Sequence, residues 1–361
     1  MSGLRILVAG AVLGQPVGGV RRHNQELLPR AQRLLDAQDG GLTVLEGARS
    51  CALELPPEIE VVHSMVPPGP PLKRALSEGA ALRGALAQAR TDGRPFGLVH
   101  TGHLPAPRRL GVPFALTLHD LRDLGGSGFR RFLSKAAIAD AIGRAAVVIC
   151  VSEMVREQVK AQFHPQATVL VPNGADHLQL LPRDEHAERF LLHVGHLEAR
   201  KDLDTLLRAM AEDRSLPELR LVGSPKGDED SRLRGLAREL GVDSRLHLEG
   251  YVDDARLAEL YAQAACVVIP SRLEGFGIPA VEALRAGAPL ALSQAAARPL
   301  GLEEGVPCFP TGNPAACARA IHRAMEGRET DPVRVAALLR QSSWDAAAQA
   351  LVQAWTDCVC S

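Results

Sequence analysis

Two glutamates and a glycine-rich loop form the pattern in this chain with the clearest chemical meaning. Glu274 stands directly before the loop 275–277, and Glu282 follows about two helical turns later. The apolar run 266–269 predicts a buried strand before the loop, and residues 278–286 predict a helix after it. A loop between a strand end and a helix N-terminus favours an anion, because backbone N–H groups and the helix dipole point toward it. Carboxylates repel phosphate, so the glutamates are expected to accept hydrogen bonds from hydroxyl groups. The pattern predicts a ligand that carries both phosphate and a polyol.

A lysine is expected at the same edge of the sheet. Lys201 follows the predicted strand 190–194 and stands at the start of the predicted helix 202–211. A cation near the positive end of a helix dipole is mildly unfavourable, which indicates an anionic partner. At this place it would neutralise the charge of a leaving phosphate. Each of these charges, taken alone, is more typical of a solvated surface, and the glycine-rich loop is what favours a site.

An alternating α/β scaffold is needed to bring these residues together. Strand-like runs alternate with helical stretches, which is typical of parallel βαβ units, and 361 residues suit two domains. We predict a Rossmann-like domain over residues 1–171, a linker over 172–188 and a second Rossmann-like domain over 189–342. A C-terminal helix, 343–361, is expected to pack back on the first domain. A cleft between the domains is the expected place for chemistry.

Seven strands are predicted in the first domain and four in the second. The strands of the first domain are 6–8, 43–45, 59–62, 98–100, 114–118, 147–151 and 168–171, and its longest helices are 21–38 and 72–89. The second domain has strands 190–194, 219–222, 246–248 and 266–269, with helices 202–211, 231–240, 255–263 and 278–286 between and after them.

Composition excludes several classes of protein. The formal net charge of -1 gives no global basic field, so charge does not suggest a nucleic-acid partner. The seven cysteines are scattered, and those in strand-like runs are expected to be reduced thiols, which indicates the cytoplasm. Cys358 and Cys360 lack a second ligand pair nearby, so no metal site is predicted there.

The N-terminal apolar run 4–13 leads into a glycine-rich turn and an amphipathic helix. This order favours a strand-loop-helix opening over a secretory signal peptide. No stretch offers 18 uninterrupted apolar residues, so no membrane span is predicted. Residues 129–135 open a basic, partly apolar helix, which suits either a surface helix packed by its apolar side or peripheral contact with the inner membrane face.

An ordered set of motifs resembles glycosyltransferase family 4, the retaining group 1 enzymes of the GT-B fold. The set comprises Gly18-Gly19, 151–153, 171–176, 194–202, 250–252 and Glu274-Gly275-Phe276-Gly277 with Glu282. The resemblance covers nearly the whole chain. It implies two Rossmann-like domains facing each other across a cleft, the N-terminal one for an acceptor and the C-terminal one for a nucleotide sugar.

The resemblance also implies roles for single residues. Lys201 and the amides of the loop 275–277 would hold the diphosphate, Glu274 would contact the donor sugar and Glu282 the ribose. The implied catalytic residues are Glu274, His119 and Lys201. The implied donor-binding residues are Gly18, Gly19, Gly195, His196, Arg200, Lys201, Tyr251, Val252, Gly275, Phe276, Gly277 and Glu282, with Tyr251 and Val252 packing the base and Gly18 and Gly19 closing on the diphosphate.

Two departures from the family pattern matter. His196 stands where many members carry an arginine that binds phosphate, so binding would depend more on Lys201, with Arg200 as a compensating donor or a surface residue. The segment 293–300 lacks the usual serine-x-leucine-proline-glutamate pattern, so that wall of the donor site has no assigned residues.

Three histidines follow strand ends in the first domain. His119, with Asp120 beside it, matches a family position near the donor sugar and acceptor, where the imidazole would hydrogen-bond a hydroxyl. His100 and His103 flank another strand end and suit either the acceptor site or a structural role.

The expected activity is transfer of a hexose, of mannose or glucose type, from a nucleoside-diphosphate sugar to a hydroxyl, with retention by same-face attack. The acceptor would be a glycan, a lipid-linked sugar or a small molecule, and the aromatic content of 3% disfavours a long stacking platform for polysaccharide. We expect no cofactor and no metal, because no Asp-x-Asp of the kind that metal-dependent transferases use is identified. The alternatives are a sugar-nucleotide epimerase of the same fold and a non-catalytic scaffold. A dehydrogenase is disfavoured because no Gly-x-Gly-x-x-Gly follows the first strand, and a glycosidase because a phosphate-binding loop separates the glutamates.

Overall fold

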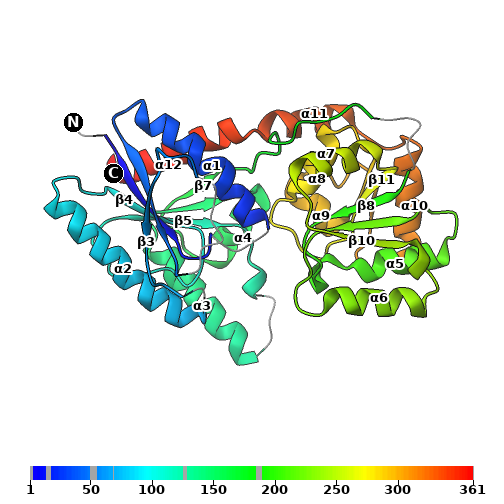
Figure 1. Cartoon of the computed structure of the whole chain (residues 1–361), viewed down its shortest axis with the longest axis horizontal. Helices are drawn as coiled ribbons and strands as arrows, with labels where there is room; N and C mark the ends of the chain where they lie inside the picture. The colour runs from blue at the N-terminus through cyan, green and yellow to red at the C-terminus, as the bar shows by residue number, and fades with distance from the viewer. Residues whose placement is uncertain are drawn as a thin grey trace. The chain divides into compact units, whose positions relative to one another are not determined.

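The computed structural model describes residues 3–13, 18–48, 55–67, 69–124, 128–183 and 189–360. The chain divides into two units (Figure 1). Residues 1–173 and 344–361 form the first unit, and residues 174–343 form the second. The chain therefore passes between the units twice, after Asn173 and before Trp344.

The first unit contains a seven-stranded parallel sheet of order β3-β2-β1-β4-β5-β6-β7. Its strands are β1 (Arg5–Gly10), β2 (Gly41–Glu46), β3 (Glu60–His63), β4 (Leu98–Thr101), β5 (Phe114–Leu118), β6 (Val147–Cys150) and β7 (Thr168–Leu170). Strands β4, β5 and β6 are buried along their whole length, which is why their sequences are mostly apolar.

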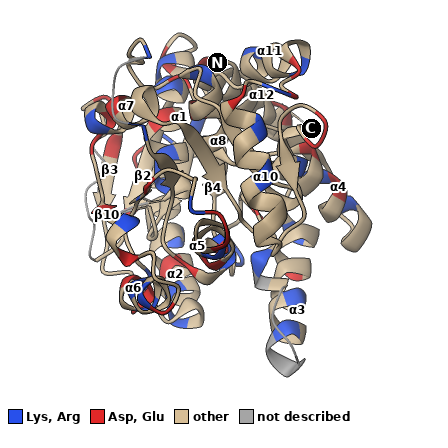
Figure 2. Ribbon diagram, turned by 90° about the vertical axis from the view of Figure 1, so that its right-hand side faces the viewer, with Lys and Arg blue, Asp and Glu red and all other residues tan. Residues whose placement is uncertain are grey.

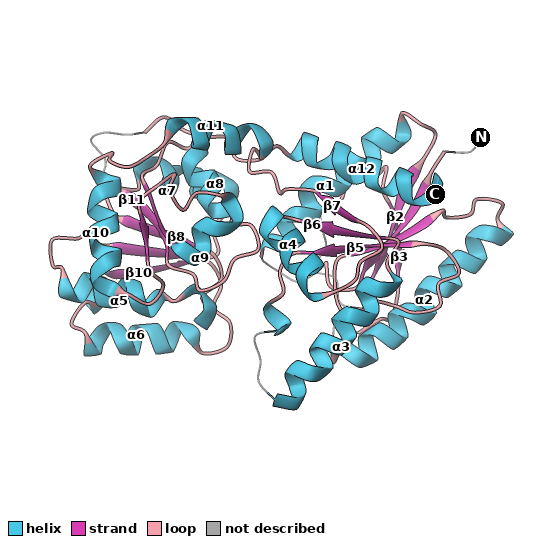
Figure 3. Cartoon of the chain, turned by 180° about the vertical axis from the view of Figure 1, so that it is seen from behind, coloured by secondary structure: helices cyan, strands magenta, loops and turns pink. Residues whose placement is uncertain are grey.

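Helices cover both faces of this sheet. Figures 1 and 3 show α1 (Gly19–Asp36) and α12 (Trp344–Cys360) on one face, and α2 (Pro71–Thr91) and α3 (Gly128–Arg144) on the other. The remaining helical segments of the unit are η1 (Arg122–Leu124) and α4 (Glu153–Gln162). The hydroxyl of Ser152 caps α4 by accepting a hydrogen bond from the N–H of Val155.

The second unit contains a six-stranded parallel sheet of order β10-β9-β8-β11-β12-β13. Its strands are β8 (Leu191–Val194), β9 (Leu219–Val222), β10 (Leu246–Gly250), β11 (Cys266–Ile269), β12 (Leu290–Ser293) and β13 (Cys308–Phe309). Its helices are η2 (Ala199–Lys201), α5 (Leu203–Glu212), α6 (Glu229–Glu239), η3 (Asp243–Arg245), α7 (Asp254–Gln263), α8 (Ile278–Arg285), α9 (Gln294–Ala297), η4 (Arg298–Leu300), α10 (Pro314–Met325) and α11 (Pro332–Gln341).

The strand order determines where each unit can bind a ligand. In the second sheet the order reverses between β8 and β11, and Figure 1 shows α5 and α6 on one face with α7 and α8 on the other. The loops after β8 and β11 therefore diverge at the carboxyl ends of these two strands, which is where open parallel sheets bind ligands. The order of the first sheet reverses in the same way between β1 and β4.

Candidate active site

Glu274 is buried in the loop after β11, and three side chains hold its carboxylate. The Lys201 ammonium donates to Oε1 at 2.6 Å, and the Ser271 hydroxyl donates to the same oxygen at 2.7 Å. The Arg200 guanidinium donates to Oε2 at 3.3 Å. The side chain is only 8% exposed, so the ion pair forms in a low dielectric.

The charge of Glu274 is maintained by these neighbours. Burial by itself raises the pKa of the carboxyl, but the cations of Lys201 and Arg200 outweigh it and lower that pKa to about 2. Glu274 is therefore a carboxylate at any physiological pH, able to accept hydrogen bonds from ligand hydroxyls.

Lys201 is held at the end of η2, the short helix after β8, and is 6% exposed. The next residue, Asp202, has a left-handed backbone (φ 51°) and starts α5, so the predicted helix begins one residue later than expected. The Asp202 carboxylate accepts from Arg272 at 2.7 Å and from the Thr205 hydroxyl at 2.8 Å. These contacts stabilise the turn at Asp202, which directs the Lys201 side chain toward the loop after β11.

Two glycines allow β8 and β9 to approach at the same place. Gly195 (φ 144°) and Gly223 (φ 138°) both have backbones that favour glycine. A Cβ on Gly223 would lie 2.0 Å from the Gly195 carbonyl oxygen, and a Cβ on Gly195 would lie 3.3 Å from the Lys201 Nζ. The space beside Lys201 therefore depends on both residues being glycine.

His196 and Arg200, the residue expected to compensate for it, have different hydrogen-bond partners. The His196 Nδ1–H donates to the Ser224 carbonyl at 3.2 Å, on the β9 side of the loop. Arg200 donates to the Leu273 carbonyl at 3.0 Å and pairs with Glu198 at 2.7 Å, in addition to its bond to Glu274. Arg200 is thus part of the scaffold around Glu274, although its side chain is still 24% exposed.

Glu282 lies on α8 and is 4% exposed. The Tyr261 hydroxyl donates to its Oε2 at 2.6 Å, and His177 Nε2 lies 3.2 Å from its Oε1. Burial and the Glu282 charge raise the pKa of Tyr261 well above its usual value, so the phenol keeps its proton and remains a donor. Of the residues expected to pack a base, Tyr251 is 64% exposed and Val252 is partly buried.

The loop that follows Glu274 leads directly into α8. Gly277 has a left-handed backbone (φ 98°) at the N-cap, and Phe276 is buried beneath the loop. The segment 293–300, which the motif pattern left unassigned, is the end of β12 followed by α9 and η4. Its Ser293 hydroxyl donates to the Ser271 carbonyl at 2.5 Å, which ties this wall to the Glu274 loop.

One polar residue that the sequence did not single out lies beneath the site. His193 is fully buried on β8, and its Nδ1–H donates to the Val268 carbonyl at 2.9 Å. Its Nε2 is buried with no hydrogen-bond partner and lies 3.8 Å from the position of a Cβ on Gly195. Burial and the Lys201 charge lower its pKa to about 4, so the ring is neutral.

The first unit contributes its candidates from the ends of β4 and β5. His119 follows β5, and its Nε2 is buried without a hydrogen-bond partner. Burial, with the charges of His23 and Arg122, lowers the pKa of His119 well below its usual value, so it acts as a neutral ring. Asp120 pairs with Arg122 at 2.8 Å.

The other two histidines have structural partners. His100 is buried in the sheet, where it accepts a hydrogen bond from the Trp355 indole at 3.1 Å. His103 Nε2 lies 2.6 Å from the carboxylate of Glu78, which is fully buried on α2. Gly18 is the N-cap of α1 with φ 130°, and Gly19 is its first residue, with open space where a Cβ would be; residues 14–17 of this loop lie outside the described residues.

Two Asp-x-Asp triplets do occur, at 202–204 and 228–230, and both aspartates of the first triplet are engaged in ion pairs. Arg232 binds Asp204 at 2.6 Å and Glu229 at 2.7 Å, while Asp202 binds Arg272. Within the described part of the chain, no group of three or more His, Cys, Asp or Glu side chains is arranged to hold a metal ion.

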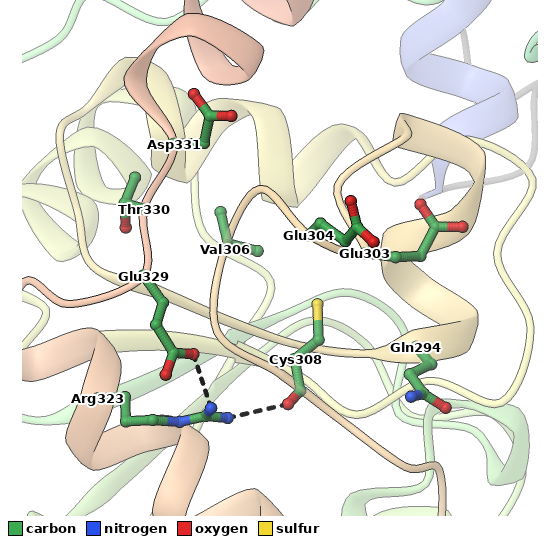
Figure 4. Close-up of a pocket in the computed structure, with 9 residues that line it drawn as sticks. All are labelled: Gln294, Glu303, Glu304, Val306, Cys308, Arg323, Glu329, Thr330 and Asp331. Atoms are coloured by element: carbon green, nitrogen blue, oxygen red, sulfur yellow. Dashed lines mark hydrogen bonds and ion pairs between the residues drawn. The ribbon is translucent and has the colours of Figure 1, made fainter.

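A pocket of about 520 Å³ lies elsewhere in the same unit and is acidic (Figure 4). It is lined by Gln294, Glu303, Glu304, Val306, Cys308, Arg323, Glu329, Thr330 and Asp331. Arg323 donates hydrogen bonds to the Glu329 carboxylate at 2.6 Å and to the Cys308 carbonyl at 3.1 Å. The surplus of carboxylates disfavours a diphosphate there, which leaves Lys201 as the better anion partner.

Comparisons with known proteins agree with the predicted family. A model of glycosyl transferases group 1 matches residues 182–335, and a model of glycosyltransferase family 4 matches residues 17–178. The D-inositol 3-phosphate glycosyltransferase 1 of Catenulispora acidiphila is 28% identical over 92% of this chain and 88% of its own. The D-inositol 3-phosphate glycosyltransferase of Thermobispora bispora is 28% identical over 98% of this chain and 94% of its own.

Solved structures support the fold class. A sucrose-phosphate synthase from Thermosynechococcus elongatus has a TM-score of 0.79 and 21% identity, covering 98% of both chains. HepE from Anabaena, solved with UDP, has a TM-score of 0.72 and 18% identity, covering 98% of this chain and 100% of its own. These matches confirm the predicted α/β GT-B fold with two domains. Among the described residues, no helix is long and apolar enough to span a bilayer.

Proposed function

The chain belongs to the group 1 glycosyltransferases, and on that premise we propose that it transfers a hexose from a nucleoside-diphosphate sugar to a hydroxyl acceptor with retention at the anomeric carbon. The observation that carries the proposal is the buried contact between Lys201 and Glu274, where the order of the second sheet reverses. A cation beside a helix N-terminus suits a diphosphate, and a carboxylate fixed next to it suits sugar hydroxyls.

In the proposed donor site, each of these residues binds a different part of the nucleotide sugar. Lys201 and the loop amides of Gly275 to Gly277 bind the diphosphate and stabilise the charge that develops as the glycosidic bond breaks. Glu274 orients the sugar, and Glu282 receives the ribose hydroxyls. Glu282 would exchange one of its present partners, Tyr261 or His177, for the ribose.

The first donors to test are UDP-glucose and GDP-mannose. A UDP donor is supported by the solved structures of HepE, which contain UDP or UDP-glucose. Mannose and glucose differ only in the configuration of the C2 hydroxyl, so both offer the same remaining hydroxyls to a carboxylate such as Glu274.

The first acceptor to test is a phosphorylated polyol, because the curated relatives are named for inositol 3-phosphate. We assign His119 to the hydroxyl chemistry of the sugar or acceptor. Its neutral ring hydrogen-bonds a hydroxyl without adding charge.

Peripheral contact with a membrane is a further part of the proposal. Helix α3 exposes Phe132 (67%) and Leu133 (51%), with Arg131 and Lys135 on the same turns, and Figure 2 shows basic residues along it. Exposed apolar residues beside lysine and arginine suit an anionic lipid surface. Flotation with phosphatidylglycerol vesicles tests this, and equal recovery of wild type and a Phe132→Ser/Leu133→Ser variant would oppose it.

The proposed activity is tested by incubating the enzyme with each donor and with inositol 3-phosphate, glucose or a lipid-linked sugar. Product formation with the donor's anomeric configuration retained, read by NMR coupling constants, supports the proposal. Inversion, or epimerisation of the donor without an acceptor, would oppose it. Transfer is expected to continue in the presence of a chelator, since both aspartates of the triplet beside Lys201 are held in ion pairs with arginines.

A further inference from the structure

His23 is a buried residue of α1 that contacts three other parts of the first unit. It is 2% exposed, and its Nδ1–H donates to the Asn173 Oδ1 at 2.7 Å. Its ring packs edge-to-face on His119, with 4.6 Å between ring centroids and 86° between planes. It also lies edge-to-face with Trp344, at 6.3 Å between centroids.

Two of these neighbours are the residues at which the chain crosses between units. Asn173 is the last residue of the first unit before the chain leaves it, and Trp344 is the first residue after the chain returns. Both are buried. Just beyond them, the N–H of Ala175 donates to the Ser342 carbonyl at 3.1 Å, so the two crossing segments are bonded to each other. The imidazole of His23 therefore contacts both segments by which the chain passes between the units.

The orientation of His119 depends on packing. Its Nε2 has no hydrogen-bond partner, so no bond at this nitrogen fixes the ring. His23, by contrast, is fixed by a short hydrogen bond, and T-shaped ring contacts have a preferred geometry. In a close-packed interior a shift of His23 would be transmitted to the ring lying against it.

We propose that His23 is a positioning residue that fixes the ring of His119 relative to the two segments where the chain crosses between the units. The catalytic consequence rests on the proposed function, but the positioning itself can be tested without turnover. His23 belongs to the first unit, whereas Lys201, Glu274 and Glu282 belong to the second, so the affinity for UDP is expected to be independent of His23.

The direct test is the two-bond ¹H–¹⁵N spectrum of the full-length enzyme labelled at histidine. The His119 signals are identified by their loss in His119→Ala. His23→Phe keeps a ring in the space but removes the bond to Asn173, and Asn173→Ala removes the same bond from the other side. Trp355→Phe is the matched control, because it removes an α12 tryptophan bond to a different buried histidine, His100.

The expected result is that the His119 signals shift or broaden in His23→Phe and in Asn173→Ala but not in Trp355→Phe. Asn173→Asp retains the acceptor oxygen and is expected to keep the wild-type signals. Unchanged His119 signals in a folded His23→Phe or Asn173→Ala protein would overturn the proposal. The hydrogen bond between His23 and Asn173 can be removed by a substitution at either residue, so the test remains possible if one of the two variants does not fold.

Turnover of UDP-glucose separates the positioning from the proposed function. If His119 is catalytic, His119→Ala and His23→Phe each lower kcat, the latter by about tenfold, with the dissociation constant for UDP unchanged. The double variant is expected to be no slower than His119→Ala, because both act through one group. Full turnover in His119→Ala would reject its role in the reaction, while the spectra would still decide whether His23 positions it.

Discussion

The Nζ of Lys201 lies 2.6 Å from the Oε1 of Glu274, and both side chains are more than nine-tenths buried. An ammonium has three N–H donors, and the carboxylate uses one of them in this contact. The lysine can therefore hold Glu274 in place and bind a phosphate oxygen at the same time.

Glu274→Gln is expected to separate sugar handling from nucleotide binding. The amide keeps the shape but leaves Lys201 and Arg200 without their shared counter-charge, so stability should fall by about 3 kcal/mol. The value of kcat should fall at least about 100-fold, while UDP binds as tightly as before or tighter. Thermal unfolding, steady-state kinetics and UDP titration measure the three effects. Glu249→Gln, which removes an ion pair with Arg220 whose side chains are 22% and 21% exposed, is the control and should change none of them much.

Glu282→Ala is expected to weaken UDP and UMP by the same factor, about tenfold, because the ribose is common to both ligands. A phosphate-binding residue would instead affect UDP more strongly than UMP. Calorimetric titration of both nucleotides measures the ratio. In the control Tyr261→Phe the carboxylate stays and one hydrogen bond is lost, so stability should fall by about 1 kcal/mol with nucleotide affinity retained. If Glu282→Ala lost more affinity for UDP than for UMP, Glu282 would act at the phosphates and not at the ribose.

Stability is expected to fall as pH decreases from about 6.5 to 4. Burial lowers the pKa of His23 and His193 to about 4 and of His100 to about 3, whereas histidines in an unfolded chain titrate near 6.5. Below pH 6.5 the unfolded state therefore binds more protons, and each histidine contributes about 1.4 kcal/mol per pH unit. Above pH 6.5 they contribute no slope, and the lowered pKa of Glu274 acts only below about pH 4.5.

Urea unfolding between pH 7.5 and 4.5 measures this dependence. His193→Gln is expected to reduce the slope by about 1.4 kcal/mol per pH unit, because one buried ring no longer titrates. The same slope in this variant as in the wild type would show that His193 is not a buried neutral ring.

Gly223→Ala is expected to disrupt the loop that carries Lys201. The new Cβ would lie 2.0 Å from the Gly195 carbonyl oxygen, and the backbone φ of 138° is strained for alanine. Stability should fall by more than about 2 kcal/mol, with loss of UDP affinity. Gly235→Ala on α6 meets open space and should stabilise the protein by about 0.5–1 kcal/mol. Thermal unfolding of the pair separates the effect of the site from that of a general glycine substitution.

Much of the scaffold could be predicted from the sequence because parallel strands buried on both faces are short, mostly apolar runs. The strands at 114–118, 219–222 and 266–269 were predicted with the bounds that the structure shows. The short strands β12 and β13, the second of which is the edge of its sheet, and the helices α10 and α11 were not predicted. Leu290 to Ser293 is a brief run with no distinctive flanks, and β13 is only two residues long.

The site was predicted only in part, because its contacts join residues far apart in the chain. The glycine pattern and the flanking strand and helix indicated Glu274, Glu282 and Lys201. Nothing in the sequence paired Glu282 with Tyr261, or placed His193 beneath Gly195, since such contacts depend on how β8, β11 and α8 pack. The buried polar residue His193 inside an apolar strand was the available signal.

The central claim is that Lys201 and the loop before α8 bind the diphosphate of a nucleotide sugar. The most direct measurement is calorimetric titration of UDP, GDP and ADP into the wild type, Lys201→Ala and the exposed control Lys226→Ala. We predict that one nucleotide binds the wild type and Lys226→Ala alike and binds Lys201→Ala at least about tenfold more weakly. Binding of none of the three, or equal affinity in Lys201→Ala, would contradict the claim.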